Sequence, residues 1–138
     1  MKSLRMLAAV AALALAGTAA AQDKVIYHFD GGLAQATKGL RNVRNHLEVD
    51  PKAKIVVVAH ADGVDFLMTG ATDPNKSPYN VAVETLKAQG VRFEVCQITL
   101  RNRKLDPKQF IPEVEFTPSG VQRITQLQQR EGYAYLKP

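Results

Sequence analysis

The chain of 138 residues contains a single cysteine, Cys96. One cysteine cannot form an intramolecular disulfide, so this thiol supplies bulk, reactivity or a bond to another molecule. The chain also lacks a long run of Lys and Arg, or a basic stripe interleaved with aromatic residues, which argues against nucleic acid as a partner. Beyond the first 21 residues, no apolar stretch is long enough to span a membrane. The sequence therefore predicts a soluble protein whose most distinctive group is one thiol.

Common signatures of nucleotide binding and of serine hydrolysis are absent too, namely G-x-G-x-x-G, G-x-x-x-x-G-K-[ST] and G-x-S-x-G. The segment Asp30-Gly31-Gly32 precedes a predicted helix, where an anion can bind the free backbone amides. It matches neither nucleotide pattern, however, and the carboxylate of Asp30 would repel a phosphate. We therefore expect no nucleotide cofactor and no cofactor of another kind.

The first residues have the composition of an export signal. Lys2 and Arg5 form a positive start, residues 6–16 are apolar, and small residues follow through Ala21. We predict a signal peptide over residues 1–21, a mature chain that begins at Gln22, and a periplasmic location. The apolar run is shorter than a membrane-spanning helix requires, and the alternative is an N-terminal anchor that is retained.

Downstream of this signal, strand-like and helix-like patterns alternate. Helices with apolar residues at steps of three and four, and strands rich in β-branched residues, are each predicted from local periodicity. The strands are predicted at residues 25–29, 55–59, 91–95, 114–117 and 133–136, and helical segments at 33–48, 62–68, 79–89, 97–104 and from 119 onward. Strands that alternate with helices, without hairpin turns, indicate a parallel sheet covered on both faces. We expect one α/β/α domain over residues 22–138, with a mainly parallel five-stranded sheet.

In open parallel sheets, functional sites form beyond the carboxyl ends of the strands. His28, His60 and Cys96 each lie at the end of a predicted strand, and Gly120 follows another. Glycine lets the backbone approach a ligand closely. We therefore expect His28, His60 and Cys96 to lie on one edge of the molecule.

Cys96 is predicted to stand at the start of a short helix. Backbone amides and cations near such a position stabilise a thiolate, and Arg101 and Arg103 are close in sequence. A lowered pKa would suit a nucleophilic or sulfur-carrying thiol. The alternatives are that Cys96 is a small buried hydrophobic residue and that Arg101, Arg103 and Lys104 form the solvated face of that helix.

His28 and His60 are candidate proton-transfer partners, or else strand-end residues whose nitrogens bond nearby carbonyl groups. Neither histidine has the short spacing to Cys96 that marks zinc sites. We therefore expect no metal site among these residues, and a metal-dependent redox enzyme is the least supported function.

Several blocks of the mature chain resemble the DsrE/DsrF-like family, which includes bacterial sulfur-relay proteins. The blocks are the first strand with its loop, and residues 41–46, 55–60, 90–103, 118–121 and 131–138. The resemblance implies a flavodoxin-like domain that assembles as a trimer or hexamer. It also implies that Cys96 matches the cysteine that accepts sulfur and passes it on as a persulfide. The relay members work in the cytoplasm beside partner subunits, whereas this chain is predicted to be exported.

The leading hypothesis is a periplasmic sulfur-handling thiol protein rather than a conventional turnover enzyme. Cys96 would cycle between thiolate and persulfide or mixed disulfide, with His28, His60 and Arg103 in the same site and a sulfur donor or acceptor protein as partner. The alternative is a non-catalytic, oligomeric module that binds a small ligand and in which Cys96 is structural.

Overall fold

The computed structural model describes residues 20–138. The predicted signal peptide, residues 1–21, therefore falls almost wholly outside the described residues. Among the helices of residues 20–138, none has the length and apolar character needed to cross a membrane.

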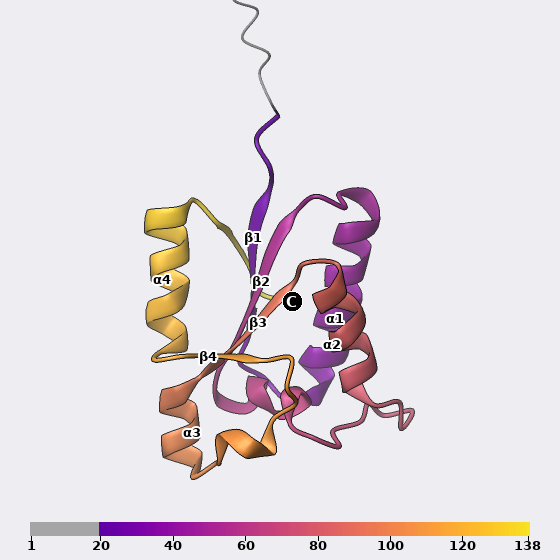
Figure 1. Cartoon of the computed structure of the whole chain (residues 1–138), viewed down its shortest axis with the longest axis vertical. Coiled ribbons are helices and arrows are strands. Elements are labelled where there is room, and N and C mark those ends of the chain that lie inside the picture. The colour runs from indigo at the N-terminus through magenta and orange to yellow at the C-terminus, as the bar shows by residue number, and fades with distance from the viewer. Residues whose placement is uncertain (1–19) are drawn as a thin grey trace, which may run out of the picture.

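Five parallel strands form one sheet in the order β4-β3-β2-β1-β5 (Figure 1). The strands are β1 (Lys24–Phe29), β2 (Lys54–Ala59), β3 (Arg92–Cys96), β4 (Glu115–Thr117) and β5 (Ala134–Leu136). The predicted five-stranded α/β fold is confirmed, and every neighbouring pair is parallel. The chain adds strands in one direction from β1 to β4 and then returns to place β5 on the other side of β1. The last strand therefore lies beside the first.

Helices cover both faces of the sheet (Figure 1). The elements are α1 (Leu33–Val49), η1 (Ala61–Leu67), α2 (Tyr79–Ala88), α3 (Gln97–Arg103), η2 (Pro107–Gln109) and α4 (Gly120–Glu131), where η denotes a 3₁₀ helix. Helices α1 and α2 lie on one face and α4 on the other, while α3 lies beyond the end of β3. The reversal of strand order explains this division, because right-handed connections on the outward and return paths fall on opposite faces.

The buried side chains of the strands alternate between these two faces. Phe29, Val57 and Phe93 pack in the core beneath α1 and α2. Ile26, Val56 and Val58 face the other way, against Ile124 and Leu127 of α4. The apolar run at residues 55–59 therefore contributes side chains to the hydrophobic core on each side of the sheet, which confirms a strand buried on both faces.

Three strands begin one residue later than predicted, for a shared reason. The backbone amide of Val91 donates to Leu86, that of Val114 to Ile111, and that of Tyr133 to Leu127. Each amide thus closes the turn that precedes its strand and does not join the sheet. Gly90, with φ of +97°, ends the turn after α2 in a backbone conformation that favours glycine.

Candidate functional site

Strand alternation brings His28, His60 and Cys96 to the α4 face, at the carboxyl end of the sheet. His28 pairs with Val58 across β1 and β2, and His60 lies two residues farther along the chain. Cys96 is the last residue of β3, so it lies on the neighbouring strand. The three residues share one edge, although 68 positions separate the first from the last.

The two histidines contact each other directly. The Nε2 atoms of His28 and His60 are 2.6 Å apart, and the Nδ1 atom of His28 lies 2.6 Å from the hydroxyl oxygen of Tyr135. His28 is buried, and this burial together with the neighbouring His60 holds the pKa of His28 below its ordinary value. A neutral imidazole carries one N–H, so one of the two facing nitrogens donates a hydrogen bond and the other accepts it.

Cys96 lines a pocket of about 370 Å³. Only 5% of the residue is exposed, and it forms the N-cap of α3, as the sequence predicts. His60, Thr99, Arg103 and Val121 help to line the pocket. The pocket therefore provides a route by which a reagent can reach the thiol.

Hydrogen bonds stabilise the thiolate form of Cys96. Burial alone would raise the pKa of the thiol, but hydrogen bonds from Gly120, Thr99 and Ile98 outweigh it and the pKa lies below its ordinary value. The donors are three backbone amides and the hydroxyl group of Thr99. The Thr99 oxygen itself accepts a hydrogen bond from the amide of Ala61 at 2.9 Å, which leaves its proton free to point at sulfur.

Gly120 lets the first turn of α4 approach the thiol. A Cβ atom at this position would lie 3.2 Å from the Cβ of His60 and 3.3 Å from the Cβ of Cys96. Both contacts are tighter than packed carbon atoms normally tolerate. Glycine at position 120 therefore lets the helix pack closely here, and a larger residue would push His60 or Cys96 aside by a few tenths of an ångström.

Arg103 lines the same pocket, but its guanidinium group already binds other groups of the protein. Its Nη1 atom binds Oδ1 of Asp65 at 2.7 Å and the carbonyl oxygen of Ala61 at 3.0 Å. Ala61 has φ of +49°, a strained conformation for a residue with a side chain. Arg103 therefore holds the strained turn after His60, while the pKa of Cys96 is lowered by amides and a hydroxyl group. Arg101 is exposed, as the solvated-face interpretation expects.

The loop before α1 is filled by a side chain of the protein. Oε1 of Gln35 accepts hydrogen bonds from the amides of Asp30 and Gly31, at 2.9 and 2.7 Å. The carboxylate of Asp30 binds Nζ of Lys137 at 2.7 Å. The amides of Asp30 and Gly31 are thus occupied by the side chain of Gln35.

Sequence reasoning missed several members of the site. Thr99 and Gly120 lay in segments after strands but carried no recognised motif, and Tyr135 lies 107 residues from His28. His28, Asp30 and His60 also bring their potential ligand atoms within 4.8 Å of one another, as do Asp23, His46 and Asp50 near the other end of β1. Sequence spacing could not predict the first group, because its members come from two strands.

Comparisons with known proteins agree with this fold. The family model described as the DsrE/DsrF-like family matches residues 5–138. A structure titled as a protein of unknown function, MTH1491 from Methanobacterium thermoautotrophicum, shares 32% sequence identity and superposes with a TM-score of 0.75, covering 85% of this chain and 100% of that one. The ychN protein from E. coli shares 18% identity with a TM-score of 0.71, covering 86% and 100%, and shows similarity of fold. Among curated proteins, none matches. The chain belongs to the DsrE/DsrF-like family.

Proposed function

We propose that the protein handles sulfur through Cys96, which accepts a sulfur atom and passes it on as a persulfide or mixed disulfide. The observation that carries this proposal is a buried thiol in the lining of a pocket, next to backbone amides and the Thr99 hydroxyl group that lower its pKa. The thiolate is the nucleophilic form of cysteine. Membership in a family that includes sulfur-relay proteins supports the same class of function.

The transfer step needs no external oxidant. The Cys96 thiolate attacks the outer sulfur of a donor persulfide, R–S–SH, and forms a new S–S bond as the donor's own S–S bond breaks. The donor leaves as the thiolate R–S⁻, and Cys96 carries the persulfide. An acceptor thiolate then attacks the outer sulfur and releases Cys96 as a thiolate. One cysteine in this chain is sufficient because the other thiols belong to the donor and the acceptor.

The pocket residues have distinct roles in this scheme. Thr99 and Gly120 stabilise the thiolate before the attack and again when the sulfur is passed on. His60 lies in the wall of the pocket, where it can take or return a proton, and His28 lies behind it. Arg103 keeps the turn after His60 in place.

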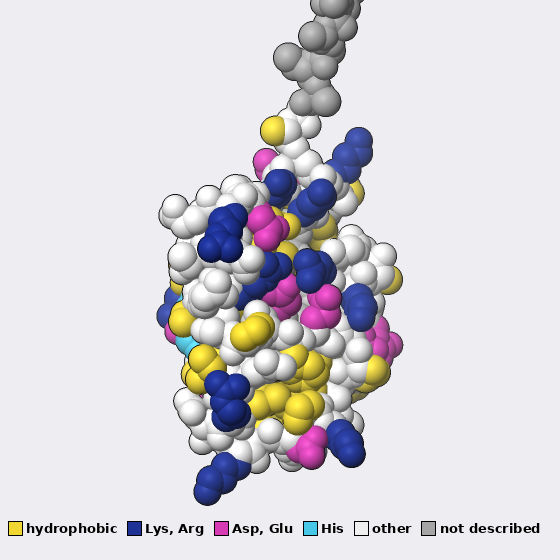
Figure 2. All heavy atoms as spheres, turned by 60° about the vertical axis from the view of Figure 1, so that its left-hand side comes forward, with side chains coloured by type: hydrophobic (Ala, Val, Ile, Leu, Met, Phe, Trp, Pro, Cys, Tyr) yellow, Lys and Arg dark blue, Asp and Glu magenta, His cyan; other side chains and the backbone are white. Residues whose placement is uncertain are grey.

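The mouth of the pocket is suited to a protein partner. Ile98 and Val121 line the pocket, and Val121 is 61% exposed. Figure 2, in which the left-hand side of Figure 1 comes forward, shows hydrophobic side chains gathered on this side of the molecule beside several basic ones. Such a surface fits the docking of a donor or acceptor protein beside the thiol.

The test is sulfur transfer from a low-molecular-weight persulfide to an acceptor thiol, followed with and without the protein. We expect the wild-type protein to accelerate the transfer and Cys96→Ser to be inactive. The exposed variant Gln97→Ala serves as the matched control and should keep the activity. Equal rates with wild-type and Cys96→Ser proteins would exclude a sulfur carrier.

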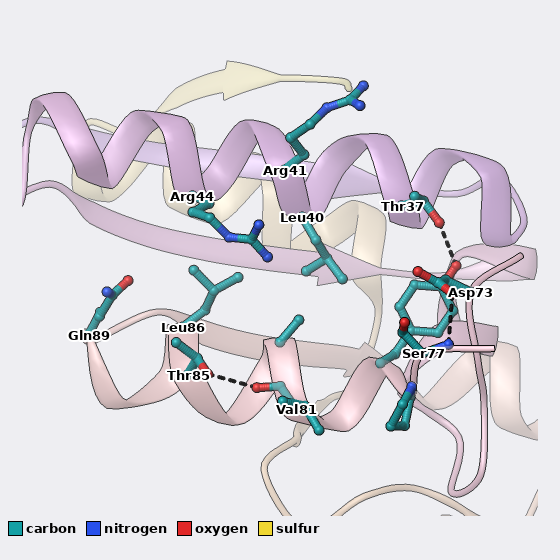
Figure 3. Close-up of a pocket in the computed structure, with 13 residues that line it drawn as sticks. Thr37, Leu40, Arg41, Arg44, Asp73, Ser77, Val81, Thr85, Leu86 and Gln89 are labelled. Carbon is teal, nitrogen blue, oxygen red and sulfur yellow. Dashed lines mark hydrogen bonds between the residues drawn. The ribbon is translucent and has the colours of Figure 1, made fainter. Parts of the chain in front are cut away.

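A groove between α1 and α2 favours the second candidate, a small-ligand-binding module. It has a volume of about 640 Å³. Leu40 and Leu86 point into the gap between the helices and Arg44 extends across it, whereas Arg41 points away (Figure 3). An apolar floor with Arg44 across it suits a small organic anion, although the carboxylate of Asp73 also lines the groove. Binding of such a ligand that Cys96→Ser leaves intact and Arg44→Ala weakens would support this function.

A further inference from the structure

Two imidazole rings and a carboxylate converge beside the Cys96 pocket. Potential ligand atoms of His28, Asp30 and His60 lie within 4.8 Å of one another, and two facing Nε2 atoms are only 2.6 Å apart. We propose that these three residues form a binding site for a borderline divalent cation of the Zn²⁺ class. The inference concerns a second chemistry on this edge of the sheet and does not depend on sulfur transfer by Cys96.

The donor set fits such an ion. Zn²⁺ binds imidazole nitrogen and carboxylate oxygen, and a site with three protein ligands keeps a fourth position for water. Tetrahedral bonds of about 2.0–2.1 Å place two nitrogen ligands about 3.3 Å apart. The Nε2 atoms of His28 and His60, which are 2.6 Å apart, would therefore separate by less than about 1 Å, and the rings would also turn, because the two nitrogens now point at each other.

Outer contacts already orient His28 for this role. The hydroxyl group of Tyr135 meets Nδ1 of His28 at 2.6 Å and directs Nε2 toward His60. Histidine ligands usually make such a second hydrogen bond through the nitrogen that does not bind the metal. Gly120 lies close to His60, since a Cβ atom added to Gly120 would lie 3.2 Å from the Cβ atom of His60.

The positive charge of Lys137 would oppose the binding of a cation by Asp30. Removal of this charge therefore tests the proposal. Its Nζ atom binds Oδ2 of Asp30 at 2.7 Å, so the carboxylate must exchange an ammonium partner for the metal. The side chain of Lys137 is half exposed and can turn into solvent. Removal of this charge should strengthen binding of the ion, whereas a purely structural histidine pair would gain no affinity for it.

The experiment is calorimetric titration of the mature protein, free of a histidine tag, with Zn²⁺. We expect one ion per chain, and affinity reduced more than about tenfold by His28→Ala or His60→Ala. Tyr135→Phe, a conservative change at a partly exposed residue, should reduce affinity roughly tenfold. Lys137→Met should increase it by up to about fivefold. Circular dichroism checks that each variant is folded.

Two control variants decide where the ion binds. His46→Ala removes the histidine of the group with Asp23 and Asp50, and Cys96→Ser removes the thiol. Both should bind Zn²⁺ as tightly as the wild-type protein. Loss of binding in either control, unchanged affinity in both His28→Ala and His60→Ala, or no binding by the wild-type protein would overturn the proposal.

Discussion

The guanidinium group of Arg123 binds the carboxylate of Glu94 through two hydrogen bonds, from Nε to Oε2 at 2.8 Å and from Nη2 to Oε1 at 3.1 Å. Both side chains are largely buried. Arg123 lies in the first turn of α4, and Glu94 lies two residues before Cys96 on β3. This ion pair therefore attaches α4 to the strand that carries the thiol, and so helps to keep Gly120 against Cys96.

Arg123→Met should lower the free energy of unfolding by about 3–5 kcal/mol, because it leaves the Glu94 carboxylate buried without its main partner. Arg92→Ala is the matched control, since Arg92 binds the same carboxylate at 3.1 Å from a half-exposed position. That change should cost no more than about 1 kcal/mol. Denaturant unfolding measures both, and equal losses would contradict a dominant role for Arg123.

Thr99→Val should raise the pKa of Cys96. The hydroxyl group donates to the thiolate, and a hydrogen bond to a charged group is worth about 1.5–3 kcal/mol, which corresponds to roughly one pKa unit or more. The rate of iodoacetamide alkylation against pH reports the midpoint, which should lie below about 8.5 in the wild-type protein. At neutral pH the variant should therefore react more slowly, because less thiolate is present.

Thr99→Ser, which keeps the hydroxyl group, and Arg101→Ala, which removes an exposed cation, are the controls for this shift. Both should leave the midpoint near the wild-type value. A large upward shift in Arg101→Ala would instead favour the sequence-based hypothesis that arginine charges lower the pKa. Alkylation that occurs only after denaturation would show that Cys96 is structural.

We expect the protein to assemble as a trimer or hexamer. All three residues of β5 are exposed at the edge of the sheet, and Leu136 is 44% exposed. An unpaired apolar edge favours association with another chain. Leu136→Lys should weaken the assembly, which light scattering at micromolar concentration measures. A wild-type protein with the mass of a monomer would contradict this expectation.

Export predicts a defined amino terminus. If residues 1–21 are a signal peptide, soluble protein from a native-like host should begin at Gln22 or within about two residues of it. Replacement of both Ala19 and Ala21 by Leu should block cleavage, since the small residues are required there. Amino-terminal sequencing distinguishes these outcomes, and soluble cytoplasmic protein that retains Met1 would refute the predicted export.

Local sequence patterns predicted the fold well because the spacing of apolar residues follows the positions that are buried. The apolar run at residues 55–59 indicated a strand covered on both faces, and the strand ends placed His28, His60 and Cys96 together. Strand order carries no comparable local signal. The placement of β5 beside β1 brings Tyr135 to His28, and this contact depends on the complete topology.

The hydrogen bond from Gly120 to Cys96 could not be predicted from the sequence for a related reason. The amide of Gly120 is a backbone group, and its direction depends on how α4 packs against β3, where Arg123 and Glu94 meet. Arg103 is a cation close to Cys96 in sequence, whereas in the structure its guanidinium group pairs with the carboxylate of Asp65. Sequence reasoning thus identified the thiol and expected both backbone amides and nearby cations to lower its pKa, whereas in the structure the lowering comes from hydrogen-bond donors and not from arginine charges.

The central claim is that the native protein carries sulfur on Cys96. Intact-protein mass spectrometry after exposure to polysulfide, with Cys96→Ser treated in parallel, tests it most directly. The account predicts that the folded wild-type protein gains the mass of one sulfur atom, that a reducing thiol removes it, and that Cys96→Ser gains none. A wild-type mass that stays unchanged, or an equal gain in both proteins, would contradict the account.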